Sequence, residues 1–176
     1  MKTVEVQLAN YKSVHFNKQN IKSHFIGIPL IVWAITLLLS LQSINVTIGD
    51  DVLTFTPAMV LLGISVVYYF TLHLKLGFGM LVYTLANIYL ASLVSAKEYA
   101  FWLAIATFVL GWVIQFIGHI YEKAKPAFLD DIMGLVIGPL FLMAEVYFAL
   151  GFEKKLHDEI TPMAIEKRRL LERSKA

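Results

Sequence analysis

Long stretches without charged residues are the main pattern along this chain. A helix that crosses a hydrocarbon layer of about 30 Å needs roughly 20 apolar residues. Four stretches without Asp, Glu, Lys, Arg or His reach this length: Phe25–Gly49, Leu53–Leu72, Leu76–Ala96 and Tyr99–Gly118. Each stretch is predicted to form a membrane-spanning helix.

A fifth apolar segment, Ile132–Ala144, is shorter and contains Gly138 and Pro139. Irregular backbone is tolerated at membrane depth only where protein or water surrounds it, so this segment is predicted to be broken or re-entrant. The chain is therefore predicted to be an all-α polytopic membrane helical bundle. It has four spanning helices, the broken or re-entrant fifth segment, and surface helices at both ends.

The basic residues lie mainly near the two ends of the chain. Only four Lys or Arg lie between Phe25 and Phe152, whereas the other eleven lie outside these bounds. Basic residues favour the cytoplasmic side of a membrane, so both termini are predicted to be cytoplasmic. We expect a membrane-embedded catalytic domain over residues 1–152, which includes an N-terminal surface helix. A basic amphipathic cytoplasmic tail over residues 153–176 is expected to rest on anionic lipid headgroups.

The composition narrows the class of protein. Hydrophobic residues make up 58% of the chain and charged residues 16%, against about 45–50% and 25% in soluble domains, which excludes an ordinary soluble globule. The chain has no cysteine, so thiol nucleophiles, iron–sulfur clusters and thiolate zinc sites are excluded. The net charge of +2 is too small to indicate a nucleic-acid partner. No protein partner is inferred.

The predicted topology brings four of the five histidines to one membrane face, which is the cytoplasmic one. These residues are His15, His24, His73 and His119. Asn17 and Asn20 are poor helix-interior residues, so a helix is expected to break there and to restart with Asn20 as N-cap. That break would allow His15 and His24, nine residues apart, to point the same way.

The fourth predicted span carries a stripe that turns from apolar to polar toward its cytoplasmic end. The stripe consists of Phe108, Trp112, Gln115, His119 and Glu122, at helical spacing. His119 and Glu122, three residues apart, lie on the same side of the helix. A glutamine inside an apolar span is costly unless it has a partner, so Gln115 is a candidate functional residue.

These side chains suit a mononuclear non-haem iron site, which needs two or three neutral imidazoles, an optional carboxylate and open positions. His15, His24 and His119 supply the imidazoles, with Glu122 either as a ligand or as the acceptor that orients an imidazole. His73 is a further candidate, although an interfacial role also fits it. Two other interpretations stay open. One is a haem-carrying protein with two axial histidines, and the other is a lipid-binding protein whose histidines are only interfacial.

Two blocks of the sequence resemble a known membrane family. The first resembles the pattern Y-x3-H-x-N-x2-N-x3-H followed by a proline, and the second resembles G-W-x2-Q-F-x-G-H followed by E-K and P-A. The first block contains Tyr11, His15, Asn17, Asn20, His24 and Pro29. The second contains Gly111, Trp112, Gln115, Phe116, Gly118, His119, Glu122, Lys123, Pro126 and Ala127. Together they resemble the family that includes the yeast 2-hydroxy fatty acid dioxygenase of phytosphingosine breakdown.

This resemblance implies an iron(II)-dependent α-oxidation, in which dioxygen converts a 2-hydroxy fatty acid into carbon dioxide and the fatty acid one carbon shorter. It implies metal ligation by His15, His24 and His119. Residues expected to bind the substrate or to orient ligands are Tyr11, Asn17, Asn20, Trp112, Gln115, Lys123 and Lys125. The chain departs from the family pattern at Glu122, which lies one residue closer to the motif histidine than usual, and His73 matches no family histidine.

Overall fold

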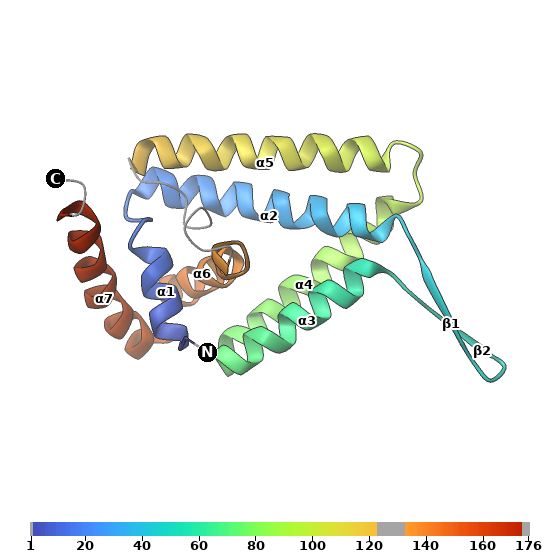
Figure 1. Cartoon of the computed structure of the whole chain (residues 1–176), viewed down its shortest axis with the longest axis horizontal. Coiled ribbons are helices and arrows are strands. Elements are labelled where there is room, and N and C mark those ends of the chain that lie inside the picture. The colour runs from blue at the N-terminus through green and yellow to red at the C-terminus, as the bar shows by residue number, and fades with distance from the viewer. Residues whose placement is uncertain (1, 123–132, 174–176) are drawn as a thin grey trace. The chain divides into compact units, whose positions relative to one another are not determined.

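The computed structural model describes residues 2–122 and 133–173. Lys123, Lys125 and Pro126 lie outside the described residues. The described part of the chain contains seven helices and one two-stranded hairpin, so the predicted all-α class is confirmed (Figure 1). In chain order these are α1 (Val4–Lys12), α2 (Lys18–Ser40), β1 (Ile44–Ile48), β2 (Asp51–Phe55), α3 (Pro57–Leu72), α4 (Leu74–Ser95), α5 (Ala100–Glu122), α6 (Met133–Ala149) and α7 (Lys154–Arg173).

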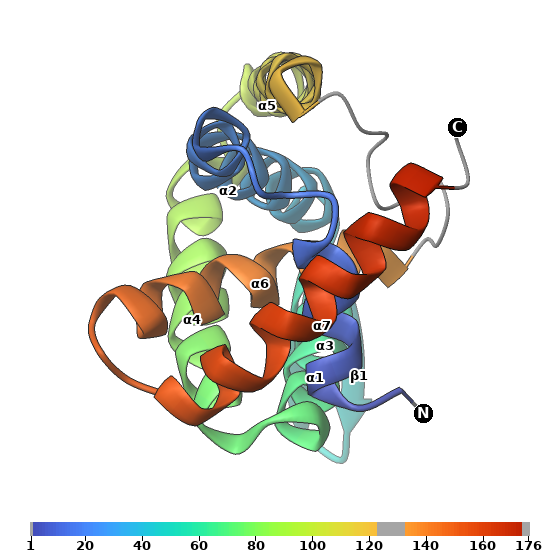
Figure 2. The ribbon, with the colours of Figure 1, turned by 90° about the vertical axis from the view of Figure 1, so that its left-hand side faces the viewer.

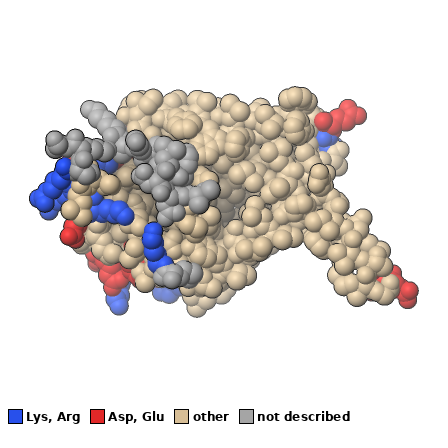
Figure 3. Space-filling view, viewed as in Figure 1, with Lys and Arg blue, Asp and Glu red and all other residues tan. Residues whose placement is uncertain are grey.

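Three helices are long and apolar enough to cross a membrane, by length and composition: α2, α4 and α5. On the face shown in Figure 3, the middle of α2 and of α5 carries no charged side chain. Large apolar side chains such as Ile64, Val82 and Trp102 are exposed. Exposure of this kind suits a hydrocarbon environment. Three of the four predicted spans are thus supported, and the fourth stays a prediction because α3, with 16 residues, is shorter than a typical span.

The first two apolar stretches are not helical over their full predicted length. Residues Ile44–Ile48 and Asp51–Phe55 form an exposed antiparallel hairpin instead. Alternating β-branched residues favour a strand, and Gly49, with φ of 63°, supplies the left-handed turn residue that a two-residue connection requires. These stretches were defined by the absence of charged residues. That criterion identifies apolar segments but does not distinguish a helix from a strand.

The predicted break in the fifth segment is wrong for the part that the structure describes. Helix α6 continues through Pro139 as one helix of 17 residues. The side chains on both sides of the proline, including Ile137, Leu140 and Phe141, are buried. Packing of this face, partly against α1, outweighs the cost of the missing backbone hydrogen bond. The re-entrant course of this segment in the membrane stays a prediction.

The described chain divides into two compact units. One unit comprises Met1–Ile26 and Ile114–Ala176, and the other comprises Gly27–Val113. The sequence-based boundary at residue 152 stays a prediction. In the first unit α1 packs against both α6 and α7, and Figure 2 shows α7 lying across α1.

In the second unit, α3 and α4 form an antiparallel pair joined at His73. A small core brings together Leu37 of α2, Ala91 of α4, and Ala100 and Ala104 of α5. Helices α2 and α5 approach closely at Gly111, where an added Cβ would lie 2.7 Å from Ile31 Cγ1 and 3.0 Å from the Gly27 carbonyl oxygen. Small residues of this kind allow helix backbones to pack closely in membranes.

Replacing Gly111 by alanine is expected to destabilise the second unit, because the new methyl group meets Ile31 and the backbone of α2. The expected loss in the free energy of unfolding in detergent is about 1–3 kcal/mol, typical of overpacking. Gly63→Ala is the matched control, because a Cβ at this helical glycine meets no heavy atom of the described chain within 4 Å. Equal stabilities of the two variants would contradict the close approach.

Candidate metal centre

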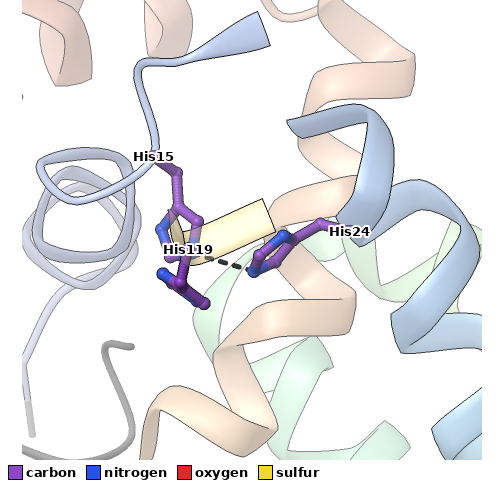
Figure 4. Close-up of side chains that lie close together, drawn as sticks. All are labelled: His15, His24 and His119. Atoms are coloured by element: carbon purple, nitrogen blue, oxygen red, sulfur yellow. Dashed lines mark hydrogen bonds between the residues drawn. The ribbon is translucent and has the colours of Figure 1, made fainter. Parts of the chain in front are cut away.

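The three predicted ligand histidines meet in the first unit. His15 lies in the link between α1 and α2, His24 on the second turn of α2, and His119 near the end of α5. The ring centroids form a triangle with sides of 4.5, 5.1 and 5.0 Å, shown in Figure 4. All three residues are buried, and each offers a ring nitrogen within 4.8 Å of the others.

The break between α1 and α2 is what brings His15 to His24, as the sequence predicted, but the capping residue is Asn17 and not Asn20. The Oδ1 atom of Asn17 accepts a hydrogen bond of 2.8 Å from the Gln19 amide, which satisfies one of the free amides of the first turn. Asn20 therefore lies inside α2. Its backbone carbonyl accepts a hydrogen bond from His24 Nδ1, and its side chain donates one to Glu122.

Backbone carbonyls determine which ring nitrogens of His15 and His24 face the centre. The Nδ1 atom of His15 is 2.6 Å from the Tyr11 carbonyl oxygen, and the Nδ1 atom of His24 is 2.8 Å from the Asn20 carbonyl oxygen. A carbonyl only accepts, so each Nδ1 carries the proton and donates it. In the neutral rings both Nε2 atoms are then lone-pair acceptors, as metal ligation requires.

These two lone pairs face each other, because the Nε2 atoms of His15 and His24 are only 3.0 Å apart. Burial, followed by the neighbouring His24, holds the pKa of His15 well below its usual range, so this imidazole is neutral near pH 7. Two neutral acceptors this close repel unless a cation lies between them. Metal–imidazole bonds are about 2.0–2.1 Å long, so two nitrogens about 3 Å apart fit one ion. The donor set therefore fits a divalent metal of the type that imidazole binds.

Aromatic side chains close one side of the histidine cluster. The Tyr11 ring stacks on the His15 ring, with centroids 4.1 Å apart and an interplanar angle of 5°. Phe141 of α6 lies against both rings, at 4.9 Å from Tyr11 and 6.0 Å from His15. The structure thus places the Tyr11 ring as packing for the His15 ring. Phe141 was not predicted from the sequence, because nothing in its local pattern distinguishes it from other apolar helix residues.

The close approach of α5 to α2 brings His119 into the cluster. At Gly118 an added Cβ would lie 1.9 Å from Ser23 Oγ and 2.7 Å from Asn20 Oδ1. A larger residue at position 118 would require the Ser23 and Asn20 side chains to move. Gln115, one turn before His119 on α5, is also buried, and its Oε1 atom has no hydrogen-bond donor among the residues that the structure describes.

Glu122 lies close to the centre but is not a member of the histidine group. Its Oε2 atom accepts hydrogen bonds from the Asn17 amide at 2.7 Å and from Asn20 Nδ2 at 3.1 Å, and its Oε1 atom accepts one from the Phe16 amide at 3.2 Å. The carboxylate therefore holds the α1–α2 link. The sequence placed Glu122 near the site but did not predict these partners.

Other predicted site residues are not members of the histidine group or lie outside the described residues. His73 is the C-cap of α3 and the N-cap of α4, with its Nδ1 atom accepting from the Leu76 amide at 3.4 Å. It is not part of the histidine group. Trp112 belongs to the second unit and has its ring against Phe108. Lys123 and Lys125 are not described.

Comparison with known proteins places the chain in a family. The family model described as 2-hydroxy-palmitic acid dioxygenase Mpo1-like matches residues 1–150. The chain belongs to the Mpo1-like family. It is 33% identical over 158 residues to the 2-hydroxy-palmitic acid dioxygenase MPO1 of Saccharomyces cerevisiae, and the match covers 85% of this chain and 83% of the yeast protein. No solved structure matches the chain. The membership confirms the resemblance that the two sequence blocks indicate.

A divalent metal is expected to stabilise this Mpo1-like protein through the three histidines. At a hundred times its Kd, Co²⁺ should raise the free energy of unfolding in detergent by about 2.7 kcal/mol. The gain should disappear in His15→Ala, His24→Ala and His119→Ala. His157→Ala is the control, because this residue lies on α7 beside Asp158 and Phe148. Equal stabilisation of His24→Ala and the wild type would exclude the cluster as the binding site.

Proposed function

We propose that the chain is a membrane-embedded, iron(II)-dependent dioxygenase that shortens 2-hydroxy fatty acids by one carbon. The observation that carries the proposal is the meeting of three buried imidazoles in a member of a family named for 2-hydroxy-palmitic acid dioxygenase. The reaction balances as 2-hydroxy acid plus dioxygen giving the shorter acid, carbon dioxide and water.

His15, His24 and His119 would hold the metal, and three imidazoles leave positions open for other ligands. Bound iron(II) would supply the one-electron chemistry that dioxygen requires and a positive charge that attracts a 2-hydroxy carboxylate. The iron assignment rests on the dioxygenase name of the yeast relative, because imidazole alone also suits zinc, copper and nickel.

The chain's own residues prepare the site by holding protons and excluding water. The Tyr11 and Asn20 carbonyls keep the Nδ1 protons of His15 and His24 in place, so their Nε2 atoms stay available. Tyr11 and Phe141 cover one side of His15 with apolar surface. A dry, apolar wall limits the access of water to a reacting carbon and suits an acyl chain.

Gln115 is a suitable acceptor for the substrate's 2-hydroxyl group. Its Oε1 atom is buried one turn from His119, with no donor among the described residues, and a buried acceptor is costly without one. A hydroxyl proton would satisfy it. Lys123 or Lys125 would attract the substrate carboxylate, as their place directly after α5 in the sequence suggests.

The proposed topology has four spans, α2 to α5, with both termini and the site at the cytoplasmic face and with α6 inserted without crossing. Three observations support it. The basic residues lie near the termini, the start of α2 and the end of α5 meet at the histidine cluster, and α6 packs on the N-terminal helix α1. The tail beyond residue 152 would lie on the same side.

Replacing any of the three histidines by alanine is expected to abolish iron-dependent conversion of 2-hydroxy-palmitic acid to the acid one carbon shorter. Mass spectrometry of the product and metal analysis of the purified protein measure the two effects. His157→Ala should retain both. Wild-type activity in His119→Ala would disprove the proposal, and a Soret band in purified wild-type protein would favour the haem-carrying alternative.

Replacing Gln115 by leucine is expected to raise the KM for the 2-hydroxy acid about fivefold, the equivalent of one neutral hydrogen bond of about 1 kcal/mol. The inhibition constant of the same fatty acid without its hydroxyl group is the control, because that molecule has no proton to donate at this position. A parallel change in both constants would assign Gln115 a packing role.

A further inference from the structure

The most heavily hydrogen-bonded charged group near the metal centre is Glu122, and the proposed chemistry does not use it. Its side chain is only 2% exposed. Its two oxygens accept from the Phe16 and Asn17 amides and from Asn20 Nδ2. Phe16 and Asn17 directly follow the ligand His15, so this carboxylate holds the backbone on the C-terminal side of that ligand.

The cation that compensates this buried carboxylate comes from α7, far away in the sequence. Arg168 Nη1 donates to Glu122 Oε1 at 3.1 Å. The same nitrogen lies 3.4 Å from the Ser13 carbonyl oxygen, and Nη2 lies 3.4 Å from the Glu122 carbonyl oxygen. Ser13 precedes His15 by two residues. Arg168 therefore reaches the link on the N-terminal side of His15 directly and on its C-terminal side through Glu122.

Up to His15 the link keeps its shape through short-range hydrogen bonds, such as the one of 2.9 Å from the His15 amide to the Lys12 carbonyl oxygen. Residues 13–17 are not helical, so the amides of Phe16 and Asn17 depend on Glu122 for their hydrogen bonds. A buried carboxylate without a compensating cation is strongly unfavourable. Removing the guanidinium would drive Glu122 toward water or toward another partner. The two amides would then lose their acceptor.

We propose that Arg168 is a positioning residue that keeps the Nε2 atom of His15 directed at His24 and His119. Arg168 acts through Glu122 and through the Ser13 carbonyl, and it touches neither substrate nor metal. The inference rests on the proposed metal centre. It extends the functional part of the chain past residue 150, where the match to the family model ends.

A role restricted to docking α7 explains these contacts less well. Helix α7 already buries Leu156, Ile160 and Ala164, and it packs against α1. Those contacts do not involve Arg168. On its outer side Arg168 Nε also donates to Glu172 Oε1 at 2.8 Å, which orients the guanidinium plane toward the link.

The test compares Arg168→Gln, Arg168→Lys and Arg169→Gln in the full-length protein in detergent. Arg169 is the matched control, because it is the next residue on α7 and is exposed. The first measurement is hydrogen–deuterium exchange of the link amides in metal-free protein. Exchange at Phe16 and Asn17 should rise in Arg168→Gln and stay unchanged in Arg169→Gln.

The second measurement is the Kd for Co²⁺, followed by its visible absorption. Arg168→Gln should weaken binding about 10- to 100-fold, the range for loss of a group that orients a metal ligand. Arg168→Lys should fall between this variant and the wild type, because lysine keeps the charge but lacks the planar fork of donors. Arg169→Gln should bind as the wild type does.

The two measurements separate failure of this inference from failure of the proposed function. Wild-type Co²⁺ affinity in Arg168→Gln, or unchanged exchange of the link amides, overturns the positioning role and leaves the metal centre intact. A wild-type protein that binds no Co²⁺ overturns the proposed metal centre and this inference with it. Faster exchange along α7 in Arg168→Gln would show that α7 has lost its docking. Arg168 would then be a docking residue, and the positioning role would be overturned.

Discussion

The site depends on two backbone carbonyls that accept hydrogen bonds from histidine rings. The Tyr11 and Asn20 carbonyls each lie one helical turn before a histidine and accept a hydrogen bond from its Nδ1–H group. With these protons held there, the Nε2 lone pairs of His15 and His24 meet at 3.0 Å. Neutral rings in this arrangement are favourable only around a cation. The fit of this cluster to a metal ion therefore follows from main-chain geometry as much as from the choice of side chains.

That geometry requires the end of α1, the start of α2 and the end of α5 to stay together. Gly118 permits the close approach of α5 to α2, because any larger residue would overlap Ser23. Asn17 caps α2 and also donates from Nδ2 to the Tyr121 carbonyl oxygen at 3.1 Å. Glu122 and Arg168 then bind the link from both sides of His15. An ion pair of 3.0 Å between Lys12 and Glu145 adds a contact between α1 and α6.

Much of the fold and the three histidines that meet were predictable, but local details were not. Absence of charge identifies α2, α4 and α5 as apolar helices, because hydropathy depends on composition alone. It misassigned Ile44–Gly49 and Leu53–Phe55, where the alternation of β-branched residues and the Gly49 turn favour a hairpin. Capping propensity placed the N-cap at Asn20, because it does not distinguish two asparagines three residues apart. Their different hydrogen-bond partners make that distinction.

The sequence by itself determined the chemistry that is available to this protein. It has imidazoles and carboxylates but no thiols, it carries apolar helices with charges near the termini, and two motifs place it in the Mpo1-like family. Only the tertiary structure decided which of these groups meet. It brought His15, His24 and His119 together, left His73 as a helix cap, and turned Glu122 from a candidate ligand into the partner of Arg168. The physical reason is that hydrogen-bond partners 46 and more residues apart are determined by helix packing, which local sequence patterns do not encode.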